Sequence, residues 1–349
     1  MALESTCSKK TLVEVSIIRP FVILLLVLLH SFTKITKGEG LTNNYNLPIV
    51  YRWFCWFISG FRIETIAMIA GYVFAYQSLE LNKSYRFWPF LLKKFKRLIV
   101  PMLVFGFVYY FCFMFDSASF TFKSFIVTLL TGCRHLWFLP MLFWCFLTIW
   151  IIDHFRLSSW FTLFLFVILF CCPRPYFSFG FAGLPRFLLF VYGGYFMWTK
   201  KKYLLQISKK SIGLLFWLLY IILVYINHAL IPKAKLTMDL LWNHLFFFVS
   251  RIGDLLMCCC GILALYLIVN NLVKKGYQPG QWILNENNCC YGIYIYHQFV
   301  LMFIYFYTPF VSSCNPLLVP WIGFVSAYGV SWVLTKLTLR IKIGRFLIG

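Results

Sequence analysis

The stretch "SIIRPFVILLLVLLHSF", residues 16–32, decides the fold class of this chain. Every side chain between Arg19 and His30 is apolar. A helix needs about 20 mostly apolar residues to cross the hydrocarbon core of a bilayer, and the stretch with its flanks reaches that length. It therefore predicts a membrane-spanning helix that carries two ionisable side chains.

The spacing of those two side chains favours a shared function. At 100° and 1.5 Å per residue, eleven steps place His30 within roughly 20° of Arg19 and about 16 Å farther along the helix axis. Ionisable groups inside a membrane are costly and usually face a cavity or a partner, so a stripe of two predicts a polar tunnel. The alternative is an Arg that snorkels to the headgroups and a His that caps the outer end of the helix.

The composition of the whole chain agrees with a membrane environment. Hydrophobic residues make up 62% of the 349 residues, charged residues only 12%, and the mean hydropathy is +0.81. A soluble core cannot bury that much apolar surface. We predict an all-α polytopic membrane protein with both termini cytoplasmic, in which residues 1–349 form one membrane-embedded domain. Ten spans are expected, at 17–33, 55–78, 98–115, 135–152, 159–173, 181–198, 211–231, 246–270, 289–310 and 317–338.

Lys and Arg residues indicate the orientation of these spans. With the N-terminus inside, twenty of them fall in inner segments and nine in outer segments. Positive charge is retained on the cytoplasmic side, which places both termini there. The formal net charge of +22 is then explained by topology and by attraction to anionic lipid headgroups, so no nucleic-acid partner is expected. A basic inner face would also suit a phosphorylated cytosolic ligand.

Six segments of the sequence, taken in order, carry a set of motifs. The first is the Arg19-to-His30 spacing, in which ten residues separate an Arg from a His. The others are "AMIAGYVFAY" (67–76), "FKRLIVPMLVFGFVYY" (95–110), "HLWFLPMLF" (135–143), "RFLLFVYGGYFMW" (186–198) and "YGIYIYHQFV" (291–300). Together they resemble the acyltransferase-3 family of integral-membrane acyltransferases. The last five are similar, in turn, to its second-helix Ser-Gly-Tyr element, its Arg-Leu-x-x-Pro element, its His-x-Trp-Phe-Leu element, its Phe-x-x-Gly-Tyr helix and its late Tyr-Leu-x-His helix.

The chain departs from the family pattern at three places. Ala70 stands where a Ser is usual, and Cys290 takes another position where relatives often have Ser. "FRIET" (61–65) brings Arg62 and Glu64 to a place where "F-H-x-P" is common. These departures put the donor or acceptor specificity in doubt more than the reaction class.

The resemblance implies an enzyme that transfers an acyl group, most often acetyl from acetyl-CoA, to a hydroxyl of a glycan or lipid-linked sugar at the cell envelope. An imidazole that titrates near pH 6.5 can accept the proton of an attacking hydroxyl, so His30 is assigned as general base or as nucleophile. Arg19 would anchor the phosphates of the donor or orient the tunnel. Arg97, together with Lys96, is predicted to bind the donor. The alternative is that Arg97 is one more of the positive charges that keep its loop on the cytoplasmic side.

Four further residues are candidates for the acceptor or for the lining of the cavity. They are His135, Trp137, Tyr294 and His297. His135 and Trp137 could instead be interfacial residues, and His297 could be bonded only to a neighbour. Arg251 and Asp254 share a helix face at spacing i, i+3, which predicts an ion pair between them.

The sequence leaves two other functional classes open. The basic and aromatic segments would also fit a transporter or flippase for a lipid-linked glycan, whereas a glycan polymerase would need larger outer loops. The sequence has no Gly-x-Ser-x-Gly elbow, phosphate-binding glycine loop or zinc motif. We expect no bound cofactor and no metal, with acyl-CoA, a sugar acceptor and membrane lipids as partners. The expected location is the cell inner membrane.

Overall fold

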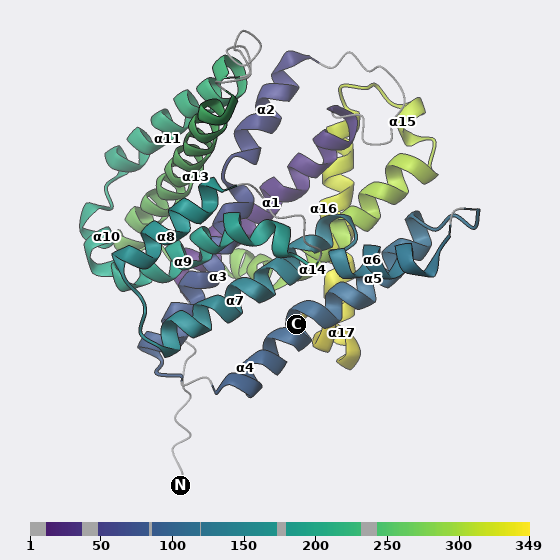
Figure 1. Ribbon diagram of the computed structural model, residues 1–349. Coiled ribbons are helices and arrows are strands. Elements are labelled where there is room, and N and C mark those ends of the chain that lie inside the picture. The colour runs from purple at the N-terminus through teal and green to yellow at the C-terminus, as the bar shows by residue number, and fades with distance from the viewer. Residues whose placement is uncertain (1–11, 37–47, 84–85, 119, 173–178, 232–242) are drawn as a thin grey trace.

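The regular elements of the described residues are all helices, as predicted (Figure 1). The computed structural model describes residues 12–36, 48–83, 86–118, 120–172, 179–231 and 243–349. The longer elements, in chain order, are α1 (Val13–Thr36), α2 (Ile49–Ser59), α3 (Arg62–Ala75), α5 (Val100–Phe113), α7 (Phe138–His154), α8 (Trp160–Cys171), α9 (Leu184–Thr199), α11 (Lys210–Tyr225), α13 (Asn243–Lys274), α14 (Gln281–Tyr307) and α16 (Val319–Arg340). The shorter elements are η1 (Tyr76–Glu80), α4 (Phe87–Lys94), η2 (Phe95–Ile99), α6 (Phe122–Thr131), η3 (Arg134–Trp137), η4 (Phe181–Gly183), α10 (Lys201–Ile207), η5 (Ile226–Leu230), α15 (Phe310–Ser313) and α17 (Lys342–Ile348).

Eight helical stretches of the described residues are long and apolar enough to cross a membrane. Each corresponds to one of the predicted spans. The other two predicted spans are α8, with 12 residues, and α9, with 16. At 1.5 Å per residue these helices are about 18 and 24 Å long, shorter than the hydrocarbon core of about 30 Å.

The closest helix packing in the bundle joins two of the family-like segments. α3 and α9 cross where Gly71 meets Val191 and Gly194 meets Met68. A Cβ atom at Gly71 would overlap the carbonyl oxygen of Val191, and one at Gly194 would overlap that of Met68. Small residues let membrane helices approach this closely because no side chain separates the backbones. The glycines of the two motifs are therefore partners in one contact.

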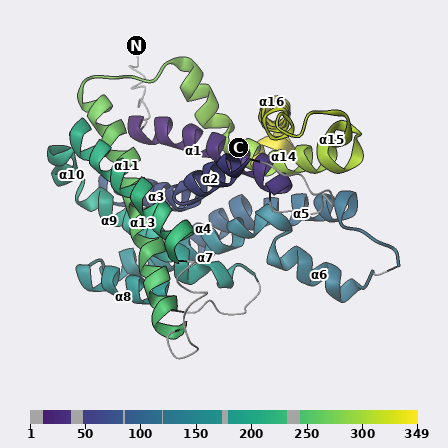
Figure 2. The same ribbon diagram turned by 90° about the horizontal axis from the view of Figure 1, so that it is seen from above.

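α1 lies at the centre of the helix arrangement, where it contacts α2, α3, α13, α14 and α16 (Figures 1 and 2). Two contacts show that α1 and α14 lie side by side and run in the same direction. Arg19 contacts Asn287, and farther along both helices His30 contacts His297. Parallel neighbours must both start on the same side of the membrane. That requirement agrees with the predicted alternation, in which both helices begin at the cytoplasmic face.

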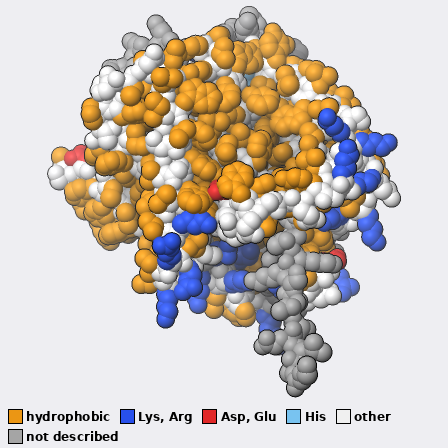
Figure 3. Space-filling view, turned by 180° about the vertical axis from the view of Figure 1, so that it is seen from behind, with side chains coloured by type: hydrophobic (Ala, Val, Ile, Leu, Met, Phe, Trp, Pro, Cys, Tyr) orange, Lys and Arg blue, Asp and Glu red, His pale blue; other side chains and the backbone are white. Residues whose placement is uncertain are grey.

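The face of the bundle drawn in Figure 3 has an apolar middle and a basic margin. Hydrophobic side chains cover most of the face shown, whereas Lys and Arg gather along its lower and right-hand margins. Exposed apolar residues over such an area are expected on helices that face lipid. The multi-pass membrane class predicted from composition is thereby confirmed.

Candidate active site

Three histidines from distant parts of the chain meet inside the bundle. His30 comes from α1, His135 from η3 and His297 from α14. His30 Nδ1 lies 2.8 Å from His297 Nε2, and these two rings stack with centroids 5.1 Å apart. His135 lies edge-on to His297, again with centroids 5.1 Å apart. His297 is fully buried, His135 is 6% exposed and His30 is half-buried. His135 is therefore packed inside the protein.

The hydrogen bonds of His297 determine which nitrogen of His30 carries a proton. His297 Nδ1 lies 3.1 Å from the carbonyl oxygen of Ile293, one turn earlier in α14. A carbonyl can only accept, so Nδ1 of His297 carries the hydrogen, and in a neutral imidazole Nε2 is then the acceptor. His30 must then donate to it from Nδ1. This tautomer leaves the lone pair of His30 on Nε2, the nitrogen that a general base uses.

Gln298 is a fourth polar group at His30. Its side-chain amide lies 2.6 Å from His30 Nδ1, and in the orientation with nitrogen toward the ring its Oε1 is buried without a hydrogen-bond partner. The oxygen and nitrogen of an amide are assigned from the hydrogen-bond network. The opposite orientation would turn Oε1 toward His30 Nδ1, and this is the orientation that the tautomer requires.

Tyr294 and His135 hold η3 against α14. The Tyr294 hydroxyl donates to the backbone oxygen of His135 at 2.5 Å, and His135 Nε2 donates to the backbone oxygen of Ile295 at 3.0 Å. These reciprocal bonds fix the edge of the histidine cluster. Trp137 is not brought into it: its ring packs against Phe138 and Phe187 instead.

The predicted donor-binding residues lie near the first turns of α1 and α14, with Arg19 on α1 and with Lys96 and Arg97 on η2. Arg19 Nη1 donates to Asn287 Oδ1 at 3.2 Å. The Arg97 guanidinium lies 5.9 Å from the ring of Tyr291, whose hydroxyl donates to the Arg97 backbone oxygen. Arg19 and Arg97 are close enough for their positive charges to repel each other. Arg97 and Lys96 are both exposed.

One face of α14 thus runs beside the Arg19-to-His30 stripe of α1. It carries Asn287, Tyr291, Tyr294 and Gln298, spaced by four, three and four residues. Sequence reasoning missed Asn287 and Gln298, although their helical periodicity in an apolar segment was a usable signal. Two surface pockets, between α2 and α11 and at the ends of η1, α4 and α7, are lined by other residues. The predicted tunnel past His30 therefore stays a prediction.

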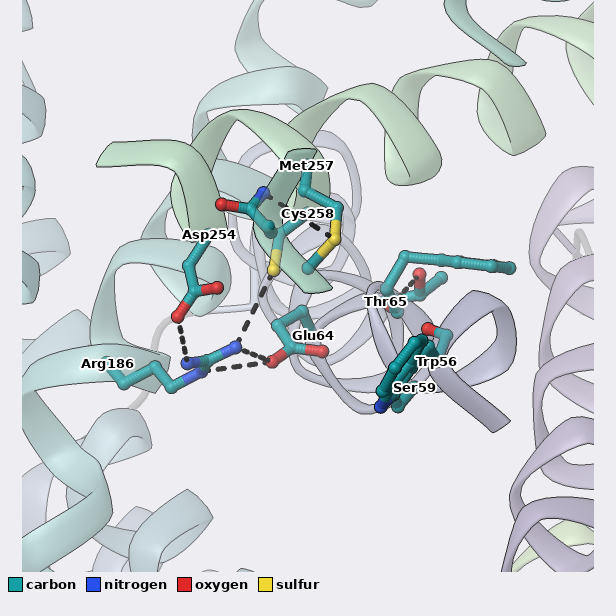
Figure 4. Close-up of polar contacts among 10 residues, drawn as sticks. Trp56, Ser59, Glu64, Thr65, Arg186, Asp254, Met257 and Cys258 are labelled. Atoms are coloured by element: carbon teal, nitrogen blue, oxygen red, sulfur yellow. Dashed lines mark hydrogen bonds and ion pairs between the residues drawn. The ribbon is translucent and has the colours of Figure 1, made fainter. Parts of the chain in front are cut away.

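A second buried polar cluster centres on Arg186 of α9 (Figure 4). Its guanidinium makes hydrogen bonds of 2.7 and 3.0 Å to Glu64 Oε1 and lies 3.9 Å from Asp254. It also contacts Cys258. The predicted pairing of Asp254 with Arg251 is wrong, because Arg251 lies over the ring of Phe247 and Asp254 faces α9. The sequence signal was Glu64 itself, since a carboxylate in an apolar span needs a cationic partner.

Replacing Arg186 by Met should destabilise the protein strongly. Glu64 is 2% exposed at its side chain, so loss of Arg186 leaves a buried carboxylate without its hydrogen-bonded cation. Such a loss costs about 3–5 kcal/mol. We expect a melting temperature in detergent well below that of wild type, with recovery when Glu64→Gln is added to Arg186→Met. Equal melting of all three proteins would show that the cluster contributes no stability.

The all-helical fold and its interior imidazoles define a multi-pass membrane protein with a polar site between its spans. The model of a protein family, described as an acyltransferase domain, matches residues 12–336. The chain therefore belongs to the acyltransferase-3 family and is an acyltransferase. No curated protein and no solved structure gave a significant match.

Proposed function

We propose that this membrane acyltransferase transfers an acetyl group from cytosolic acetyl-CoA to a hydroxyl of an envelope glycan or lipid-linked sugar, and that it works in a bacterial-type inner membrane. The observation that carries the proposal is the contact of His30 with His297 inside the bundle, with Arg19 on the same face of α1. The family match supplies the reaction class.

The spacing of the two α1 groups fits the length of the donor. Between its diphosphate and its sulfur, CoA has about as many bonds as four extended residues, which span about 14 Å. Arg19 and His30 are about 16 Å apart along the helix axis. With the diphosphate at Arg19 and Arg97, the thioester would therefore reach His30. Guanidinium groups suit this role because they bind phosphate oxygens in a bidentate manner.

The chemical step follows from the tautomer of His30. Nε2 of His30 accepts the proton of the acceptor hydroxyl as its oxygen attacks the thioester carbonyl. The new C–O bond forms, the C–S bond breaks, and the CoA sulfur leaves as a thiolate. The imidazolium then returns the proton to that sulfur, so that the products are the sugar ester and CoA. His297 positions His30 in this step by holding its Nδ1 hydrogen.

Replacing His297 by Phe tests that positioning role. The variant keeps a ring against His30 but removes the acceptor nitrogen, so kcat should fall about 10- to 100-fold, the range expected for one oriented hydrogen bond. The KM for acetyl-CoA should stay near the wild-type value. His297→Gln, whose amide oxygen can accept, should recover part of kcat. A rise in KM with kcat unchanged, at equal melting temperature, would contradict the role.

The glycan acceptor is tested in cells. A strain that lacks the gene is complemented with wild type or His30→Gln at matched membrane abundance, and acetyl esters of the surface glycan are measured by NMR and mass spectrometry. We expect wild type alone to restore an alkali-labile acetyl ester. Absence of the whole glycan without the gene would favour export by a flippase, and restoration by both proteins would exclude His30 from the chemistry.

A further inference from the structure

A polar pocket that shares no lining residue with the three-histidine cluster lies where η1 and α7 end and α4 begins, on the side of the bundle predicted to be cytoplasmic. Its volume is about 620 Å³. Two cationic residues, Lys83 and Arg86, line it together with the rings of Phe87, Trp150 and His154. The His154 ring stacks on Trp150 with centroids 4.8 Å apart. The Phe87 ring also contacts Trp150, with centroids 5.1 Å apart. None of these residues has a part in the proposed acyl transfer.

The charge of the pocket favours an anion. Lys83 and Arg86 are exposed, and among the described residues no carboxylate lies within ion-pair distance of either. Asp153 also lines the pocket, but its two oxygens already accept hydrogen bonds of 2.6 Å from Ser78 and Tyr195. A Lys and an Arg side by side are suited to a phosphate, which both can contact with charge-assisted hydrogen bonds.

The surroundings of the pocket favour a lipid as the source of that phosphate. Large apolar side chains next to it are exposed: Trp88 and Leu92 on α4 are 68% and 54% exposed, and Phe155 after α7 is 64% exposed. On a membrane protein such side chains face acyl chains. Trp and His rings beside Lys and Arg are typical of the headgroup level of the membrane. A ligand here would have its charged part in the pocket and its chains along α4.

We propose that this pocket, formed by Lys83, Arg86, Phe87, Trp150 and His154, binds the phosphate headgroup of an anionic phospholipid of the cytoplasmic leaflet. Basic pockets between spanning helices on this side are suited to such headgroups. The bound lipid would join the end of η1 to α4 and α7. The pocket lies on surface elements, so the inference does not depend on the identity of the sugar acceptor.

The test is lipid binding to the purified full-length protein, measured by native mass spectrometry. Dioctanoyl phosphatidylglycerol and dioctanoyl phosphatidylcholine are titrated onto wild type, Lys83→Gln/Arg86→Gln and a control, Lys275→Gln/Arg340→Gln. The control removes the same two charges from exposed cytoplasmic positions elsewhere. We expect the pocket variant to bind phosphatidylglycerol about thirtyfold more weakly, since each cation contributes about fivefold. The control should bind as wild type does.

Three results would overturn the proposal. In the first, the pocket variant binds phosphatidylglycerol as tightly as wild type. In the second, the control variant weakens as much, so that the whole basic face attracts the lipid without a site. In the third, soluble glycerol phosphate or adenosine 3′,5′-bisphosphate binds wild type as tightly as the lipid does, and the pocket variant loses that binding. Both substituted side chains are exposed, so the variant should fold.

Discussion

Replacing His30 by Gln should lower kcat for acetyl transfer by about 10²- to 10⁴-fold, the contribution of a positioned general base. The amide of Gln can still form hydrogen bonds with His297 and Gln298, so the helix contact should survive while the base is lost. Because His30 would act only in the chemical step, the KM for acetyl-CoA should change little. The measurement is steady-state transfer from labelled acetyl-CoA by purified protein.

The control for this variant is His228→Gln, which makes the same chemical change on η5. His228 stacks on Trp56, and no described contact joins it to the three-histidine cluster. It should keep wild-type turnover. If His30→Gln also turns over at the wild-type rate with an unchanged melting temperature, His30 is a structural residue. The assignment of the active site to the α1–α14 contact would then fall.

The second large effect is expected at Arg19. Arg19→Gln should raise the KM for acetyl-CoA about 10- to 100-fold, since hydrogen bonds to charged groups contribute about 1.5–3 kcal/mol. Asn287, its hydrogen-bond partner in α14, would still be able to bond the amide of Gln. The KM is obtained by varying acetyl-CoA at saturating acceptor. Arg340→Gln, which removes an exposed charge on the same side of the membrane, should leave it unchanged.

A truncated donor separates the phosphate contact from a structural effect. S-acetylpantetheine lacks the diphosphate, so its turnover should be equally slow with wild type and with Arg19→Gln. Turnover is measured for both proteins with both donors. These four measurements form a thermodynamic cycle, and its coupling energy reports the interaction between Arg19 and the donor phosphates. A cycle without coupling would mean that Arg19 acts on the helix arrangement and not on the donor.

The membrane class, the helical content and the approximate spans could be read from residue order alone. A continuous apolar run of about 20 residues has one stable form in a bilayer, because only a helix satisfies its own backbone hydrogen bonds there. The relation between Arg19 and His30 was equally local, since 3.6 residues per turn determine which side chains share a face. These predictions did not depend on any other helix.

Tertiary structure decided which groups surround His30. His297 and His135 were separate candidates on other helices, and the hydrogen bond from His30 to His297 joins positions 267 residues apart. Sequence analysis gave Arg186 no partner, yet it pairs with Glu64, 122 residues away, while Arg251 does not pair with the nearby Asp254. Local spacing allowed the wrong pairing, and it could not indicate which helix supplies the cationic partner of Glu64.

The difference between what the sequence determined and what the tertiary structure decided has one physical reason. The hydrophobic pattern of a span fixes its depth and its polar face, because both depend on the bilayer and on helix geometry. It does not fix the neighbours of that face, because lipid tails are as apolar as the helices and give no preference among them. The neighbours are selected by close packing, as where Gly71 and Gly194 let the backbones of α3 and α9 meet. Sequence therefore determined that an imidazole lies within the first span at His30, and the packing of α1 against α14 determined its tautomer and its partners.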